Sequence, residues 1–157
     1  MEDERFMREA LALAQAAAGE GEVPVGCVVV RDGEIVGRGR NRREGAKSAL
    51  AHAEIEAIAE ACRTLGGWRL WQCTLYVTLE PCPMCAGAII NARIPRVVYG
   101  AKEPVNGCCG SAIDLFLLPC SQKPEVVPGV LEEDCAAALR TFFRHLREKR
   151  KGETAEE

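Results

Sequence analysis

Long apolar stretches are absent from this sequence, and none approaches the about 20 residues that a membrane-spanning helix needs. The first residues, 1–5, are mostly acidic, unlike the basic and then apolar start of a secretory signal. Histidine is scarce as well: the chain contains only two, so a metal site with a nitrogen ligand has few candidates. These absences predict a soluble, cytoplasmic protein with no membrane partner.

Cysteine, in contrast, is abundant, with nine residues. The odd count and the lack of a secretory signal argue against a disulfide scaffold. Cys27, Cys62 and Cys135 lie within apolar segments, and a free cysteine behaves as a small hydrophobic residue. We therefore expect most of the cysteines to be core residues in a reducing compartment.

The net charge of −3 argues against nucleic-acid binding by the whole surface, but basic residues gather in two segments. The first cluster comprises Arg38, Arg40, Arg42, Arg43 and Lys47, and the second comprises Arg140, Arg144, Arg147, Lys149, Arg150 and Lys151. Two such patches on an acidic protein suit a local polyanion. Two solvated faces explain the same pattern equally well, so charge alone leaves both interpretations open.

Hydrophobic periodicity predicts alternating helices and strands. Helices are expected over 2–18, over 52–65, after Pro81, near 112–117 and from Leu131 onward, and strands over 25–30, 35–40, 75–79, 96–99 and 126–127. The Asp32-Gly33 pair is typical of a hairpin turn. This order favours a mixed sheet with helices on both faces. Without a repeat or a linker, we expect one domain, residues 1–151, followed by a flexible acidic tail, residues 152–157.

Helical spacing also predicts which side chains face the core. In the helix after His52, the expected inward face consists of Ile55, Ile58, Ala59, Cys62 and Leu65. In the last helix, it consists of Cys135, Leu139, Phe142, Phe143 and Leu146, with Arg144 and Arg147 on a neighbouring basic stripe.

A P-C-x-x-C run, Pro81-Cys82-Pro83-Met84-Cys85, stands where an apolar strand gives way to a helix. Proline suits the first helical position, where its missing N–H costs nothing. The two cysteines, three residues apart, share one face of the first turn, where the positive end of the helix dipole favours thiolates. Two thiolates held in this way form half of a zinc site.

The best candidate to complete this zinc site is His52, which opens a predicted helix as His52-Ala53-Glu54, whereas His145 lies in the basic terminal segment. Three protein ligands leave a fourth tetrahedral position for water, as catalytic zinc requires. Glu54 can carry the water's proton only if His52 lies in the first turn. On its own, an H-x-E motif usually marks only the start of a helix, and a C-x-x-C motif is ambiguous. Together and in this order, the two motifs match the zinc deaminase signature and favour a catalytic site.

Further segments extend this match: Glu22-Val23-Pro24-Val25-Gly26, Asn41, Ala51-His52-Ala53-Glu54, the run 74–88 and Phe142-Phe143-Arg144. With them the chain resembles the bacterial tRNA-specific adenosine deaminases of the zinc-dependent cytidine/deoxycytidylate deaminase superfamily, from the first helix to about Lys151. The resemblance implies a single zinc-dependent deaminase domain with the cytidine deaminase-like three-layer α/β/α sandwich and a mixed five-stranded sheet. It also implies hydrolysis of adenosine to inosine at the wobble position of a tRNA anticodon, with release of ammonia.

Carried over to this chain, the resemblance implies that His52, Cys82 and Cys85 bind one Zn²⁺ per subunit. Glu54 would be the catalytic proton shuttle, which takes the water's proton, delivers it to N1 of adenine and then protonates the leaving amine. Asn41 would hydrogen-bond the flipped-out nucleotide. A homodimer is expected on the same ground.

The expected macromolecular partner is a tRNA anticodon stem-loop, whose phosphates Arg144, Arg147 and the first basic cluster are placed to bind. Two departures from the family concern this interaction. The family commonly has an Asp and, two residues later, a Lys where this chain has Glu103 and Val105, and it often has Asp-Pro-Thr at the segment 48–50. Neither departure changes a predicted metal ligand.

Two other functions fit parts of the sequence. A deaminase of a free base or nucleotide, of the guanine or cytosine type, would share the zinc site, but a small neutral base needs no cationic stripe on the last helix. A noncatalytic zinc or RNA-binding module would use a fourth Cys or His ligand and has no use for Glu54.

Overall fold

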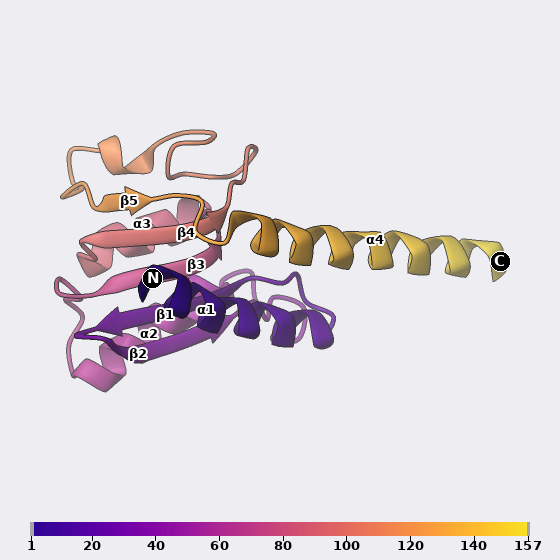
Figure 1. Cartoon of the computed structure of the whole chain (residues 1–157), viewed down its shortest axis with the longest axis horizontal. Helices are drawn as coiled ribbons and strands as arrows, with labels where there is room; N and C mark the ends of the chain where they lie inside the picture. Colours follow the sequence, from indigo (N-terminus) through magenta and orange to yellow (C-terminus); the bar gives the residue numbers. More distant parts are fainter. Residues whose placement is uncertain (1, 157) are drawn as a thin grey trace.

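Five strands form one mixed sheet at the centre of the molecule (Figure 1), in the computed structural model, which describes residues 2–156 and their side chains up to residue 153. In sheet order the strands are β2 (Glu34–Arg40), β1 (Gly26–Arg31), β3 (Thr74–Leu79), β4 (Arg96–Ala101) and β5 (Glu125–Val127). Strand β1 is antiparallel to both of its neighbours, whereas β3, β4 and β5 run parallel. Asp32 and Gly33 join β1 to β2 with φ of 51° and 76°, which confirms the predicted hairpin turn.

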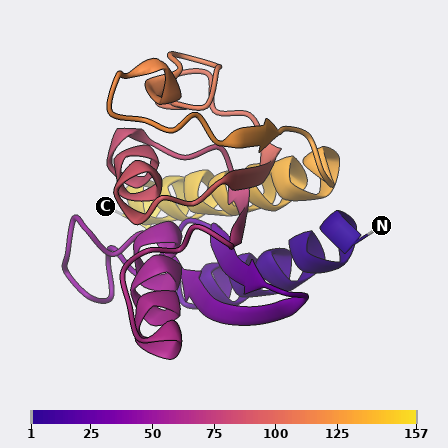
Figure 2. The ribbon, with the colours of Figure 1, turned by 90° about the vertical axis from the view of Figure 1, so that its left-hand side faces the viewer.

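Helices cover both faces of this sheet, so the predicted three-layer architecture is confirmed (Figure 2). Helices α1 (Glu2–Gly19) and α4 (Glu132–Glu156) lie on one face, and α2 (Ala53–Leu65) and α3 (Pro83–Ala92) lie on the other. The short helix expected near 112–117 is a single 3₁₀ turn, η1 (Leu115–Leu117). Within the described chain, no helix combines the length and the apolar character that crossing a membrane would demand.

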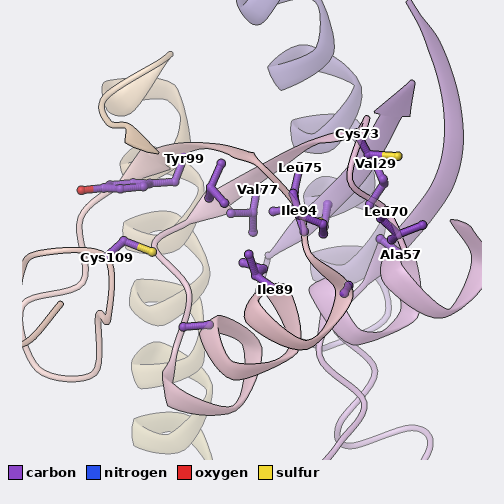
Figure 3. Close-up of a cluster of buried hydrophobic side chains, with 14 of the residues drawn as sticks. Val29, Ala57, Leu70, Cys73, Leu75, Val77, Ile89, Ile94, Tyr99 and Cys109 are labelled. Atoms are coloured by element: carbon purple, nitrogen blue, oxygen red, sulfur yellow. The ribbon is translucent and has the colours of Figure 1, made fainter. Parts of the chain in front are cut away.

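The alternation of side chains along the strands divides the core between the two faces. Val29 of β1, together with Leu75 and Val77 of β3, packs under α2 and α3 with Ile89 (Figure 3). The alternate residues of the same strands, such as Val28, pack under α1 and α4. Both faces of the central strands are therefore buried, which explains their nearly continuous apolar sequences.

The predicted inward face of α2 is correct only in part: Ile58, Cys62 and Leu65 pack against the core as predicted. The fully buried residues are instead Ala53, Ala57 and Ala61, because the helix lies directly on the backbone of β2. A Cβ atom at Gly37 or Gly39 would lie 2.2 or 2.1 Å from a backbone oxygen of α2, so only glycine permits this approach. Of the residues predicted to be buried, Ile55, Ile58, Cys62 and Leu65 are half-buried and Ala59 is exposed.

Helix α4 packs on the sheet only through its first part and then projects beyond the body of the molecule (Figure 1). Cys135 is buried as predicted, but Phe143, predicted to face inward, is 40% exposed and belongs to neither core cluster of the described residues. The helix continues to Glu156, where a tail was expected. The domain boundary at Lys151 and the flexibility of the tail stay predictions, and Glu157 lies outside the described residues.

Candidate active site

Two helix N-termini meet at one end of the sheet and carry the predicted metal ligands. His52 is the N-cap of α2 and Cys82 is the N-cap of α3, whose first residue is Pro83 as predicted. The side chain of His52 does not cap its own helix, and the Sγ of Cys82 lies near the backbone N–H groups of the first turn of α3, so both side chains face the same point between the two helices. Strand β3 ends directly before α3, at the edge where ligands bind in open α/β sheets.

The three predicted ligands lie at distances that suit zinc. The Nδ1 atom of His52 is 3.6 Å from the Sγ of Cys82 and 3.6 Å from the Sγ of Cys85. With Zn–N of about 2.0–2.1 Å and Zn–S of about 2.3 Å, a tetrahedral centre separates N and S by about 3.6 Å. Within the described residues no other His, Cys, Asp or Glu joins this group, so the site fits zinc with one open position.

The side chains of Cys82 and Cys85 form a hydrogen bond with each other that favours the binding of a cation. A hydrogen bond from Cys85, opposed by burial, lowers the pKa of Cys82 to about 5, and the nearby His52 lowers it further. The same hydrogen bond and burial raise the pKa of Cys85. The pair therefore carries a thiolate at neutral pH, and binding a dication would release the remaining proton.

Glu54 is buried beside these ligands, with only 4% of its surface exposed. It lies in the first turn of α2, two residues after the N-cap His52, which is the placement that a shuttle at this position requires. Burial raises the pKa of Glu54 to about 7, and the charge of Cys82 acts in the same direction. A carboxyl group with such a pKa can both accept and donate a proton near neutral pH.

A cleft of about 720 Å³ opens over Glu54 and two of the ligands, His52 and Cys82. Two loops form much of its rim: the first rim loop, residues 41–51, contributes Asn41 and Arg43, and the second rim loop, residues 102–111, contributes residues up to Asn106. Phe143 of α4 closes a third side, although the sequence predicted it to lie in the core. This volume lies in the range of small-molecule sites and admits a nucleobase with its sugar.

Asn41 lines the cleft, and its side chain is held in place. Its Nδ2 donates to the carbonyl of Val23 at 3.3 Å, and its Oδ1 accepts from the N–H of Arg43 at 3.1 Å. A carboxamide has a second N–H and a second lone pair, so it keeps one donor and one acceptor for a ligand.

The structure does not bring Arg144 and Arg147 into the cleft. Both are exposed on α4 and neither lines the cleft, although Arg144 directly follows Phe143. A second cleft of about 700 Å³, between α1 and α4, also contains neither of them. The first basic cluster is partly neutralised, since Arg40 pairs with Glu20 at 2.7 Å and Arg42 with Glu56 at 3.2 Å.

Sequence reasoning assigned no role to two further buried residues, Glu22 and Glu80, which hydrogen-bond to the rim loops. Burial raises the pKa of the Glu80 carboxyl, but hydrogen bonds from Ser111 and from backbone N–H groups outweigh it, so the pKa lies below its usual value. Both glutamates lie in segments that carry the family resemblance. This resemblance was the only sign in the sequence that the two residues matter, because the loops they contact are distant in sequence.

The chain matches the family model of the cytidine and deoxycytidylate deaminase zinc-binding region over residues 1–101 and belongs to that family. A tRNA-specific adenosine deaminase from Bacillus subtilis is 50% identical over 151 residues, covering 96% of this chain and 94% of that protein. The resemblance found in the sequence is thereby confirmed, and the protein is a zinc-dependent deaminase of this superfamily.

Solved structures agree with this assignment. One, from a study of A-to-I editing by deaminases at the wobble position of transfer RNA, has a TM-score of 0.83 and 45% identity, and the match covers 86% of this chain and 99% of that chain. Another, a guanine deaminase from Bacillus subtilis, has a TM-score of 0.61 and 43% identity, with coverage of 63% and 64%. The predicted cytidine deaminase-like fold is confirmed.

Proposed function

We propose that this protein deaminates adenosine to inosine at the wobble position of a tRNA anticodon, with water consumed and ammonia released. The observation that carries the proposal is a His-Cys-Cys site with a buried glutamate, in a chain 50% identical to a tRNA-specific adenosine deaminase over 96% of its length. The catalytic residue is Glu54, and the metal ligands are His52, Cys82 and Cys85.

The chemistry requires a nucleophilic water and a proton carrier. Zinc, when bound by the three ligands, supplies the Lewis acid that makes water reactive at neutral pH. Glu54 accepts a proton from the attacking water and delivers it to N1 of the base. A second transfer protonates the exocyclic amine as its bond to C6 breaks, so ammonia leaves and the oxygen of water remains on the base. Glu54, buried beside the three ligands in the first turn of α2, is placed for both transfers.

Substrate binding is divided between the cleft and the basic helix. Asn41 orients the extruded nucleotide through the donor and acceptor that its backbone contacts leave free. Phe143 provides an apolar wall on which a neighbouring base can stack. Arg144 and Arg147, both exposed on α4, bind phosphates of the stem-loop.

A cytoplasmic location and a homodimer are part of the same proposal. Large apolar side chains that the single chain leaves exposed, including Leu50, Ile113 and Leu117, support a partner surface. Light scattering over a range of protein concentrations tests the dimer: a mass twice that of the chain is expected, and a monomer at all concentrations would rule it out.

The decisive experiment offers the zinc-loaded protein an anticodon stem-loop with A at the wobble position, beside free guanine, cytosine and adenosine. Inosine is measured by nucleoside chromatography after digestion, and a stem-loop with wobble G is the control. We expect inosine in the RNA and no ammonia from the free bases. Turnover of a free base with unchanged RNA would refute the tRNA assignment.

The guanine deaminase neighbour makes deamination of free guanine the second candidate function. The same cleft would accept a purine, and the same Glu54 would transfer the protons. The exposed basic stripe on α4 favours RNA, because binding of a neutral base gains nothing from cations outside the cleft. Guanine turnover that is insensitive to salt would favour this alternative.

A further inference from the structure

Only four polar or charged side chains are found among the fully buried residues of the described chain: Glu22, Glu54, Thr78 and Glu80. Burying a carboxylate is costly unless it is well hydrogen-bonded, so each one requires an explanation. Glu54 has a catalytic role, and the hydroxyl of Thr78 accepts from the N–H of Gly26 at the start of β1. The side chains of Glu22 and Glu80 are not in the metal-ligand group and bond to no strand, although Glu80 lines the cleft.

Glu80 holds the second rim loop by its backbone. Its Oε1 accepts from the N–H of Glu103 at 3.1 Å and from the hydroxyl of Ser111. Its Oε2 accepts from the N–H groups of Cys109 and Ser111 at 3.0 and 3.1 Å. One buried carboxylate thus fixes both ends of the loop, and charge-assisted bonds of this kind are stronger than neutral ones.

The tip of the same loop is closed by Glu103. Its carboxylate accepts from the N–H groups of Val105 and Asn106, at 3.1 and 2.7 Å. Residue 107 must be glycine, because a Cβ atom there would lie 2.5 Å from the Cδ of Glu80. The loop therefore has a defined shape that presents Val105, 77% exposed, and Asn106 at the cleft.

Glu22 holds the first rim loop in the same way on the other side of the cleft. Its Oε1 accepts from the N–H of Glu44 at 2.9 Å, and its Oε2 accepts from the N–H of Gly45 at 2.7 Å. The bonded segment directly follows Asn41 and Arg43, which line the cleft. Each rim loop is therefore held by one buried carboxylate: Glu80 directly follows strand β3, and Glu22 lies shortly before strand β1.

We propose that Glu22 and Glu80 are positioning residues for the RNA substrate: they hold the two rim loops in the shape that receives the nucleotides flanking the target base. This inference rests on the proposed function, since the flanking nucleotides exist only in an RNA substrate. A free base would occupy the cleft floor near Glu54 and Asn41 and would not contact the rest of the two loops. Preformed loops reduce the conformational entropy lost on binding, so their loosening raises KM more than it lowers kcat.

The test uses Glu80→Gln and Glu22→Gln, which keep the size of the side chain but replace one acceptor oxygen by an NH₂ group that faces N–H donors. We expect the KM for the wobble-A stem-loop to rise about tenfold in each, as the loss of a buried charge-assisted hydrogen bond suggests, while kcat and the zinc content stay close to wild type. Hydrogen exchange should accelerate at residues 103–111 in the first variant and at 44–45 in the second.

Thr78→Val is the matched control, because it removes a buried side-chain hydrogen bond that holds a strand rather than a rim loop. We expect it to lower the unfolding temperature without a selective rise in KM. Ser111→Ala removes only one of the donors to Glu80 and should give a smaller rise in KM, so it replaces Glu80→Gln if that variant does not fold.

Two results would overturn the inference. Faster exchange in a rim loop with unchanged KM would mean that the loops do not hold the substrate, and unchanged exchange would mean that the glutamates do not hold the loops. If the wild-type protein leaves the stem-loop unmodified, the proposed function is refuted instead. The hydrogen-exchange rates then still show whether the two glutamates hold the rim loops.

Discussion

The two faces of the sheet carry different parts of the activity. On one face, α2 and α3 begin at the same end of the sheet, and their first turns bring His52, Glu54, Cys82 and Cys85 together at the floor of the cleft. On the other face, α1 is packed along the sheet, while α4 leaves the body and carries its arginines into solvent (Figure 1).

This difference indicates which packing contacts determine the geometry of the site and which residues determine the charge of the surface. The chemical groups need angström precision, and they obtain it from two helix starts. The start of α2 is fixed by the packing of alanines on the glycines of β2, and α3 is fixed by the burial of residues such as Ala86 and Ile89 in the core. In the proposed function, the arginines that attract RNA would need only the right charge in the right region, and a projecting helix would suffice. Substitutions on the first face should therefore change kcat and zinc content, and those on the second face should change KM or stability.

The largest effect is expected for Glu54→Ala. Without the proton carrier, kcat should fall by a factor of about 10²–10⁴. The zinc content, measured by atomic absorption, should stay at the wild-type level, because Glu54 is not among the ligands. Cys85→Ser is the paired variant: it should lose both zinc and activity. Full activity in Glu54→Ala would contradict the shuttle.

A smaller effect is expected for Arg144→Ala and Arg147→Ala on the opposite face. Together they should raise the KM for the stem-loop about tenfold at moderate salt, with unchanged kcat, and reduce the slope of log KM against log salt by about 1–2. Arg140→Ala is the control on the same helix, since this arginine is already paired with Glu133. Equal salt slopes in all variants would show that α4 does not bind the RNA.

The same contrast explains what the sequence could predict. The order of elements, the hairpin at Asp32-Gly33 and the placement of Cys82 at a helix start follow from local rules of periodicity, turn chemistry and capping, and all three agree with the structure. The convergence of His52 with the two cysteines, 30 and 33 residues apart, was accessible because the spacing is a known chemical signature.

The errors came from contacts that periodicity cannot register. The fully buried alanines of α2 depend on glycines in β2, and Phe143 is exposed because α4 packs on the core only through its first part in the described structure. The roles of Glu22 and Glu80 depend on loops that fold back over more than 20 residues. Long-range packing decides each of these, and a local pattern carries no information about it.

The smallest effect on catalysis is expected for Asp3→Asn, at the packing contact of α1. Asp3 forms a bidentate ion pair with Arg96 of β4 at 2.8 and 2.9 Å and accepts a hydrogen bond from the hydroxyl of Tyr76. Removing this charge should lower the unfolding free energy at neutral pH by about 1–2 kcal/mol. Neither KM nor kcat should change, because the contact lies outside the cleft and away from the basic stripe of α4.

The pH dependence of this loss has a definite sign. The hydrogen bond from Arg96, opposed by burial and aided by Tyr76, lowers the pKa of Asp3 in the folded protein. The stabilisation is therefore complete above the unfolded pKa of about 4 and disappears as pH falls through the lower, folded value. Chemical denaturation should show wild type and Asp3→Asn converging below about pH 4. Glu4→Gln, which breaks only an exposed pair with Arg8, should behave like wild type throughout. A constant difference down to low pH would mean that packing, not the ion pair, holds α1 to the sheet.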